Sequence, residues 1–75
     1  MREEIMNMLL KIRPEVDFST SSDFIEDSLL DSFDVISLIN MIEEKYGITV
    51  DGMEIIPENF CGIDQIMKLV ESHKV

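Results

Sequence analysis

Apolar residues recur at helical spacing most clearly over residues 31–46. They fall at i, i+3, i+4, i+7 and i+11, which places them on one continuous stripe of an α-helix. The stripe consists of Val35, Leu38, Ile39, Ile42 and Tyr46. Gly47 follows directly and suits the left-handed conformation that often ends a helix. The pattern therefore predicts a strongly amphipathic helix over residues 31–46.

Residues 2–12 and 63–73 show the same spacing over shorter stretches. In the first, the apolar positions are Ile5, Met8, Leu9 and Ile12. Glu3 and Glu4 suit its first turn, and Pro14 is a stop signal. In the second, the positions expected to be buried are Ile63, Ile66, Met67 and Val70. Gly62 precedes them and is suited to the N-cap.

The two remaining segments predict a long and a short connection. Residues 14–30 are rich in Ser, Thr and Asp, but they also carry apolar residues that would pin the loop to the core. These are Phe18, Phe24, Ile25 and Leu29. Within residues 48–60, the turn at Gly52 and the proline at Pro57 leave space for only one or two helical turns. We therefore predict an all-α fold, a small four-helix bundle with a long first loop and a short third helix.

Length and composition restrict the class of protein. The 75 residues are expected to form one domain over residues 1–75. Cys61 is the single cysteine, so there is neither an internal disulfide framework nor a Cys cluster for zinc. No apolar run reaches the roughly 18 residues of a membrane span, and residues 1–8 do not resemble the apolar part of a signal peptide. A cytoplasmic protein is the expectation.

The charge is strongly acidic and unevenly distributed. The formal net charge is −10, and no Lys or Arg occurs from Pro14 through Glu44. Nucleic-acid binding requires cationic side chains, so it is not expected. The acidic surface has two interpretations: it is a solvated face that maintains solubility, or it steers the protein towards basic patches on other proteins.

The sequence contains no motif that supports a catalytic site or a metal site. Calcium-loop registers starting at Asp17 or Asp23 place a serine at the sixth position, where the loop needs glycine. There is no GxSxG turn, and His73 lies near a C-terminus expected to fray. Cys61 has no base nearby in sequence, so a half-buried packing role is favoured. We therefore predict no metal site and no enzymatic activity.

The start of the 31–46 helix carries a different signal. Asp31 is among the best N-cap residues, and on that reading Ser32 would only be part of a helix start. The second face of the same helix is not explained by capping, because Phe33 and Ile36 lie off the core stripe within a turn of Ser32. The other residues of this face are Ser37, Asn40, Glu43 and Glu44. A hydroxyl beside two apolar side chains and several acids indicates a docking surface.

These residues resemble the acyl carrier proteins and the related peptidyl and D-alanyl carrier proteins. The hallmark of that family is an Asp-Ser-hydrophobic motif at the start of the second of four helices, which reads Asp31-Ser32-Phe33 here. The resemblance covers nearly the whole chain and includes IEEKYGI at 42–48 and PENFCGIDQIMKLV at 57–70.

The resemblance implies that a phosphopantetheinyl transferase attaches 4′-phosphopantetheine from coenzyme A to the Ser32 hydroxyl. The thiol of that arm would hold an acyl or aminoacyl group as a thioester. Further implied partners are loading ligases, synthases and transferases with basic docking patches, which a monomeric carrier without membrane insertion would meet in turn. The implied partner-recognition surface consists of Asp31, Phe33, Ile36, Asn40, Glu43 and Glu44.

Two departures from the family pattern leave more than one biosynthetic pathway for such a carrier. Ser37 and Asn40 stand where fatty-acid-synthesis carriers typically have an acid and a methionine, and LLDS is more typical of stand-alone carriers outside primary fatty acid synthesis. One alternative is a D-alanyl or aminoacyl carrier for cell-envelope polymer modification or a specialised biosynthetic cluster. An alternative of another class is an unmodified acidic helical interaction module. The sequence names neither the cargo nor the partner enzymes.

Overall fold

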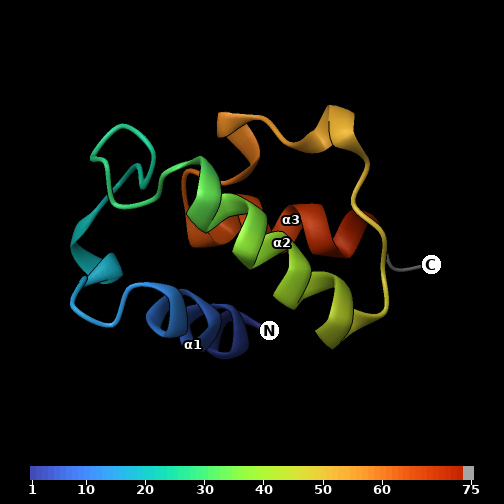
Figure 1. The fold of residues 1–75 in the computed structure, drawn as a ribbon, viewed down its shortest axis with the longest axis horizontal. Coiled ribbons are helices and arrows are strands. Elements are labelled where there is room, and N and C mark those ends of the chain that lie inside the picture. Colours follow the sequence, from blue (N-terminus) through green and yellow to red (C-terminus); the bar gives the residue numbers. More distant parts are fainter. Residues whose placement is uncertain (74–75) are drawn as a thin grey trace.

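The three segments with helical spacing form α-helices that pack around one apolar core (Figure 1). The computed structural model describes residues 1–73. Helix α1 packs against both α2 and α3. The α-helices are α1 (Arg2–Ile12), α2 (Ser32–Tyr46) and α3 (Ile63–Ser72), and the 3₁₀ turns are η1 (Phe18–Thr20), η2 (Gly52–Glu54) and η3 (Pro57–Asn59). No strand occurs within residues 1–73, so the all-α prediction is confirmed for that range.

Helix α1 has the predicted bounds and buries most of its predicted face. Ile5, Met8 and Leu9 are buried, whereas Ile12 is half-buried at the end of the helix. The N–H of Arg13 still donates to the carbonyl of Leu9 at 2.9 Å. The chain leaves the helix there because the next residue, Pro14, has no N–H to continue the ladder.

Helix α2 places its predicted apolar stripe in the centre of the core. Val35, Leu38, Ile39 and Ile42 are buried, and Tyr46 at the end of the stripe is half-buried. Gly47 ends the helix with φ 66° and ψ 35°, a left-handed conformation that glycine adopts without steric cost. Its N–H donates to the carbonyl of Glu43 at 2.9 Å.

The long connection before α2 is pinned to the core, as predicted. Phe18 and Phe24 are buried and pack edge to face, with ring centroids 5.1 Å apart. The Phe24 carbonyl accepts the N–H groups of Leu29 and Leu30, at 2.8 and 3.2 Å, and the Phe24 N–H donates to the Cys61 carbonyl at 2.7 Å. One aromatic residue therefore ties the approach to α2 to the segment that enters α3.

The short third α-helix predicted within residues 48–60 does not form, and the described chain has three α-helices instead of four. This segment, here named the strap, contains only the turns η2 and η3. Pro57 has no N–H, and it biases the preceding Ile56 to the extended conformation found there, with φ −127° and ψ 152°. The Asp51 carboxylate also caps η2 by accepting the Met53 N–H at 2.9 Å. The strap is thus divided into two turns that are too short for an α-helix.

Helix α3 buries a slightly different face from the predicted one. Ile63, Ile66 and Val70 are buried as expected, and Gly62 is the N-cap. Met67 is only half-buried, and Leu69, which the prediction left out, is buried instead. Leu69 lies three residues after Ile66 and one before Val70, so the core face of the helix is rotated slightly towards it.

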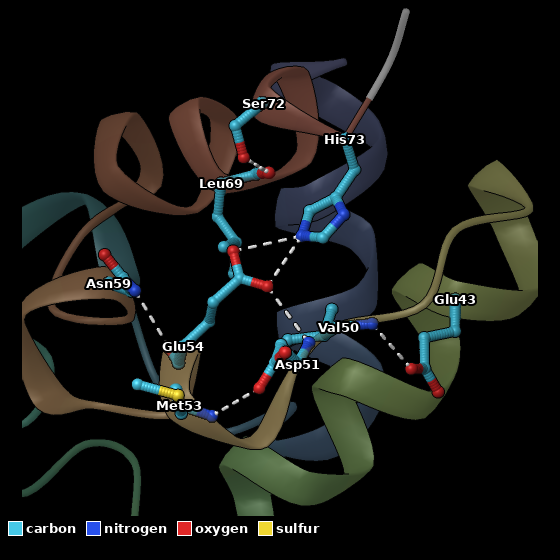
Figure 2. Close-up of polar contacts among 9 residues, drawn as sticks. All are labelled: Glu43, Val50, Asp51, Met53, Glu54, Asn59, Leu69, Ser72 and His73. Atoms are coloured by element: carbon cyan, nitrogen blue, oxygen red, sulfur yellow. Dashed lines mark hydrogen bonds and ion pairs between the residues drawn. The ribbon is translucent and has the colours of Figure 1, made fainter.

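The end of α3 is tied to the strap by His73, while the C-terminus that was expected to fray, residues 74–75, lies outside the described residues. His73 Nε2 lies 2.8 and 3.0 Å from the two carboxylate oxygens of Glu54, and both side chains are partly buried (Figure 2). The same carboxylate accepts the Asp51 N–H at 3.0 Å. Asn59 Nδ2 in turn donates to the Glu54 carbonyl at 2.8 Å. Glu54 therefore links the strap to the end of α3 by a side-chain contact.

Tyr46 is the only tyrosine in the chain, so the ionisation of its hydroxyl can be followed by itself as the pH is raised. Burial, together with the hydrogen bond that its hydroxyl donates to Glu4 at 2.8 Å, raises the pKa of Tyr46 to about 12. An unfolded tyrosine ionises near pH 10. The stabilising contribution of Tyr46 should therefore be complete below about pH 10 and disappear as the pH rises towards about 12.

The measurement is an alkaline titration of phenolate absorbance, followed in parallel with circular dichroism to report folding. We expect a midpoint well above that of a free tyrosine while the helices remain intact. Glu4→Gln should move the midpoint downward, because it removes the carboxylate charge that opposes phenolate formation. A midpoint near pH 10 in the still-folded protein would contradict the burial of this hydroxyl.

Candidate functional site

The start of α2 is fixed by a reciprocal pair of hydrogen bonds. Asp31 is the N-cap and has an extended backbone, with φ −104° and ψ −175°. Its Oδ1 accepts the Asp34 N–H at 2.9 Å, and Asp34 Oδ2 accepts the Asp31 N–H at 3.1 Å. This is a capping box, built here from two aspartates. The predicted role of Asp31 as the cap is confirmed, and Asp34 adds the reciprocal bond of the capping box.

Ser32 is the first residue of α2 and lies between the two capping aspartates. Its side chain is exposed. Within residues 1–73, its hydroxyl has no hydrogen-bond partner. The cap is made by its neighbours, so the Ser32 hydroxyl is not used by the fold.

A cation also lies at this helix start. Arg13, from the end of α1, contacts Asp34 Oδ2 through Nε at 2.9 Å and Nη2 at 2.8 Å, and Nη2 lies 3.3 Å from Asp31 Oδ2. Burial of Asp34 opposes its ionisation, but the Asp31 N–H and the Arg13 guanidinium outweigh burial, so the pKa of Asp34 is lowered. The site is therefore a serine hydroxyl flanked in sequence by two capping carboxylates that share one guanidinium.

An apolar cleft of about 330 Å³ opens beside Ser32, between the start of α2 and the strap. We name it the Ser32 cleft. Apart from Asp31 and Ser32 at its mouth, the side chains that line it are apolar. They are Ile25, Leu30, Val35, Ile36, Ile55, Ile56, Pro57 and Phe60. The segments far apart in sequence that form it lie on the same side of the molecule (Figure 1).

Most of the predicted partner-recognition surface is accessible. Phe33 is 83% exposed and Ile36 is 48% exposed, which is unusual for side chains of this size and hydrophobicity. Asp31, Asn40 and Glu44 are also exposed. Together they form a continuous face along α2, beginning at Ser32.

Glu43, which was also assigned to the partner-recognition surface, has a contact within the fold. It is half-buried, and its Oε2 accepts the Val50 N–H at 2.9 Å (Figure 2). The carboxylate thus holds the first part of the strap against the end of α2. This contact joins residues seven apart across the Gly47 turn, so the helical pattern alone could not indicate it.

Sequence reasoning missed the contribution of the strap. Met53 is 86% exposed, and Ile55 and Ile56 are also exposed while lining the Ser32 cleft. An available signal was the run GMEIIP at residues 52–57, in which apolar residues fit neither helical nor strand spacing. Apolar side chains that no regular element buries are candidates for a binding surface.

Within residues 1–73, no group of three or more His, Cys, Asp or Glu side chains is placed to hold a metal ion. No helix among those residues is long and apolar enough to cross a membrane. Cys61 is half-buried, as predicted, and its Sγ lies 3.6 Å from the carbonyl oxygen of Glu58.

Comparison with known proteins assigns the chain to a family. The family model described as a phosphopantetheine attachment site matches residues 3–59. The chain is also similar to the acyl carrier protein of Wolinella succinogenes, with 29% identity over 72 residues that cover 96% of this chain and 91% of that protein. No solved structure matches the chain. Because the family model spans more than half of the chain, including the whole start of α2, the resemblance seen in the sequence is confirmed: this protein belongs to the phosphopantetheine attachment-site family, which includes the acyl carrier proteins.

Proposed function

We propose that the chain carries acyl groups as thioesters on a 4′-phosphopantetheine attached to Ser32. The observation that carries this proposal is the Ser32 hydroxyl itself, exposed in the first turn of α2 and free of hydrogen bonds to residues 1–73. The match to the attachment-site family supports the cofactor, because the matched residues include Ser32.

The residues around Ser32 fit such a group. The Ser32 oxygen must form an ester bond and release its proton on loading, so a hydroxyl already used in a cap would be a poor acceptor. The first turn of a helix also offers free N–H groups and the positive end of the helix dipole to a phosphodiester. When attached, phosphopantetheine supplies a terminal thiol that holds the acyl group.

The Ser32 cleft favours an acyl cargo with an apolar chain. Its walls are aliphatic and aromatic, and the described part of the chain places no cationic side chain in them. A charged amino group would lose hydration there without gaining a partner, whereas a hydrocarbon chain would be favoured by burial. This supports an acyl carrier over the D-alanyl or aminoacyl alternative.

We infer that the protein presents its cargo and performs no catalysis itself. His73, the only histidine, is engaged with Glu54 at the end of α3 instead of lying near Ser32. The chemistry would then belong to partner enzymes: a phosphopantetheinyl transferase, then a loading ligase, synthases and transferases. One carrier domain over residues 1–75, a monomeric state and a cytoplasmic location stay predictions.

The exposed face of α2 is the proposed docking surface for these partners. Its apolar end at Phe33 and Ile36 adjoins the attachment point, and Glu44 adds charge further along. The net charge of −10 favours partners with basic patches, since opposite charges raise the association rate.

The proposal is tested by loading the purified protein. Incubation with coenzyme A, Mg²⁺ and a broad-specificity phosphopantetheinyl transferase should add one phosphopantetheine, as measured by intact mass. Proteolysis should place the added mass on the peptide that contains Ser32. A folded protein that remains unmodified with several such transferases would overturn the carrier assignment and leave the acidic interaction module.

The docking surface gives a further prediction. Ile36→Asp should weaken binding to the transferase by about tenfold or more, because a buried apolar contact is lost, while helix content stays near normal. Leu10→Asp is the matched control: Leu10 is also an exposed apolar residue, but it lies on α1. Binding is measured by calorimetry or transferase kinetics. Equal weakening by both variants, or unfolding by Ile36→Asp, would contradict the assigned face.

The charged part of the surface is tested separately with Glu44→Lys, because Glu43 has a structural bond to the strap. Glu44→Lys should lower the association rate, and added salt should mask the difference. Glu71→Lys, at an exposed position on α3, produces the same change in net charge and should have a smaller effect. Equal slowing by the two variants would assign the effect to net charge alone.

A further inference from the structure

Arg13 connects the end of α1 to the helix start that holds Ser32. Its guanidinium lies against both aspartates of the capping box, with Nε and Nη2 on Asp34 Oδ2 and Nη2 also near Asp31 Oδ2. The next contact, from Nη1 to Glu15 at 3.8 Å, is longer and more exposed. The tight contacts of Arg13 are thus those to the two residues that set the conformation of the first turn of α2.

The contact between Arg13 and Asp34 is more protected than an ordinary surface ion pair. The Asp34 side chain is only 13% exposed, and its Oδ2 accepts the Asp31 N–H as well as the Arg13 donors. The hydrogen bond to Asp34 in turn raises the pKa of the Arg13 guanidinium. A planar guanidinium can hold both carboxylates at once, which a lysine ammonium cannot reproduce in the same geometry.

The location of Arg13 matters because the region lacks other cations. No Lys or Arg occurs from Pro14 through Glu44, so Arg13 immediately precedes a long acidic stretch. Ser32 lies between two carboxylates, and the donor of its prosthetic group, coenzyme A, carries phosphate groups. Without a cation, those carboxylates would repel each other and any anion that approaches the hydroxyl.

We propose that Arg13 is a positioning residue for the modification of Ser32: by clamping Asp31 and Asp34, it holds the first turn of α2 in the conformation that presents the hydroxyl to the transferase. This inference rests on the proposed function, because it assumes that Ser32 is the acceptor. Arg13 contacts the cap and not the hydroxyl, so it acts through Asp31 and Asp34. Its effect should therefore fall mainly on kcat.

The experiment compares Arg13→Gln with wild type in transferase kinetics, at a temperature well below the Tm of each variant. Global destabilisation alone leaves the folded fraction unchanged under those conditions, so it cannot lower the rate. We expect kcat to fall by roughly ten- to a hundredfold, since small errors in position have effects of that size. Arg13→Lys should recover part of the rate because it restores the charge but not the double contact.

Arg2→Gln is the matched control. Arg2 is also paired with an aspartate, Asp64, but it lies at the start of α1, and both side chains are largely exposed. The substitution changes the net charge by the same amount. It should leave kcat near the wild-type value. An equal loss in Arg2→Gln would assign the effect to net charge and overturn the role of Arg13.

A second measurement tests the clamp without the transferase. Amide hydrogen exchange at Asp31 and Asp34 should accelerate in Arg13→Gln and change little in Arg2→Gln, because only the first substitution releases the capping box. Wild-type kcat and unchanged exchange in a folded Arg13→Gln protein would overturn the inference alone. Wild type that stays unmodified would instead overturn the proposed function, and this positioning role with it.

Discussion

Ser32→Ala is expected to abolish phosphopantetheine loading while leaving the fold intact. The substitution removes the only atom proposed to form the ester bond. It removes no hydrogen bond within residues 1–73, because Asp31 and Asp34 make the cap. Alanine is also a good helix former, so the Tm should be unchanged or slightly higher. Intact mass and thermal melting measure the two outcomes.

The control for this prediction is Ser37→Ala. Ser37 is another exposed serine of α2, and its loss should leave loading at the wild-type level. Thiol labelling gives an independent count: the apo-protein has only Cys61, and the loaded wild type should have one thiol more. Ser32→Ala that still gains the full mass would show that another residue is the acceptor.

Phe24→Ala is expected to destabilise the protein more than any exposed substitution. Phe24 is 2% exposed, and its ring packs on Phe18. Truncating a buried phenylalanine costs about 3–5 kcal/mol, whereas the whole stability of a domain of this size is on the order of 5–10 kcal/mol. The Tm should therefore fall by roughly 15–30 °C. Thermal melting followed by circular dichroism is the measurement.

Phe33→Ala provides the contrasting result with the same chemical change. Its side chain is 83% exposed, so truncation should leave the Tm within a few degrees of wild type. Binding to the transferase should weaken instead, because the ring belongs to the proposed docking surface. Similar melting curves for the two variants would contradict the assignment of Phe24 to the core or of Phe33 to the surface.

Phe24→Ala should also affect the loading of Ser32 at the candidate site. The Phe24 carbonyl holds the N–H groups of Leu29 and Leu30, the two residues that lead into the cap of α2. Alanine keeps this carbonyl but loses the buried ring that anchors it. Under conditions where Phe24→Ala is still folded, we therefore expect slower loading of Ser32, because the segment that leads into α2 is less constrained.

The parts of the fold that were predictable from sequence are those set by local periodicity. The bounds of α1 and α2 follow from the apolar spacing and from the stop signals at Pro14 and Gly47. Asp31 could be assigned to the cap because capping depends on residues close in sequence. Exposure of Phe33 and Ile36 followed from the same periodicity, since both lie off the stripe.

The remaining features depend on contacts between distant segments. Arg13 meets Asp34 across 21 residues, and His73 meets Glu54 across 19, and no local pattern indicates either pair. The strap was predicted to contain a short helix because the turn at Gly52 and the proline at Pro57 leave space for one or two helical turns. Its actual form is set by Pro57 and by carboxylates that bind its backbone N–H groups, including those of Glu43 and Glu54.

The construction of the strap has a consequence for cargo of different sizes. One wall of the Ser32 cleft is α2, whose position is fixed by a ladder of backbone hydrogen bonds and a buried stripe. The opposite wall is the strap, whose middle part at Ile55, Ile56 and Pro57 is exposed, while Val50 and Phe60 at its two ends are buried in the core. Moving these exposed residues outward breaks partly solvated contacts such as Glu54–His73 and leaves the buried ends of the strap in place, so it requires less free energy than moving α2. The cleft is accordingly asymmetric in stiffness: a longer acyl chain would be accommodated by outward movement of the middle of the strap, while Ser32, on the rigid wall, keeps its place.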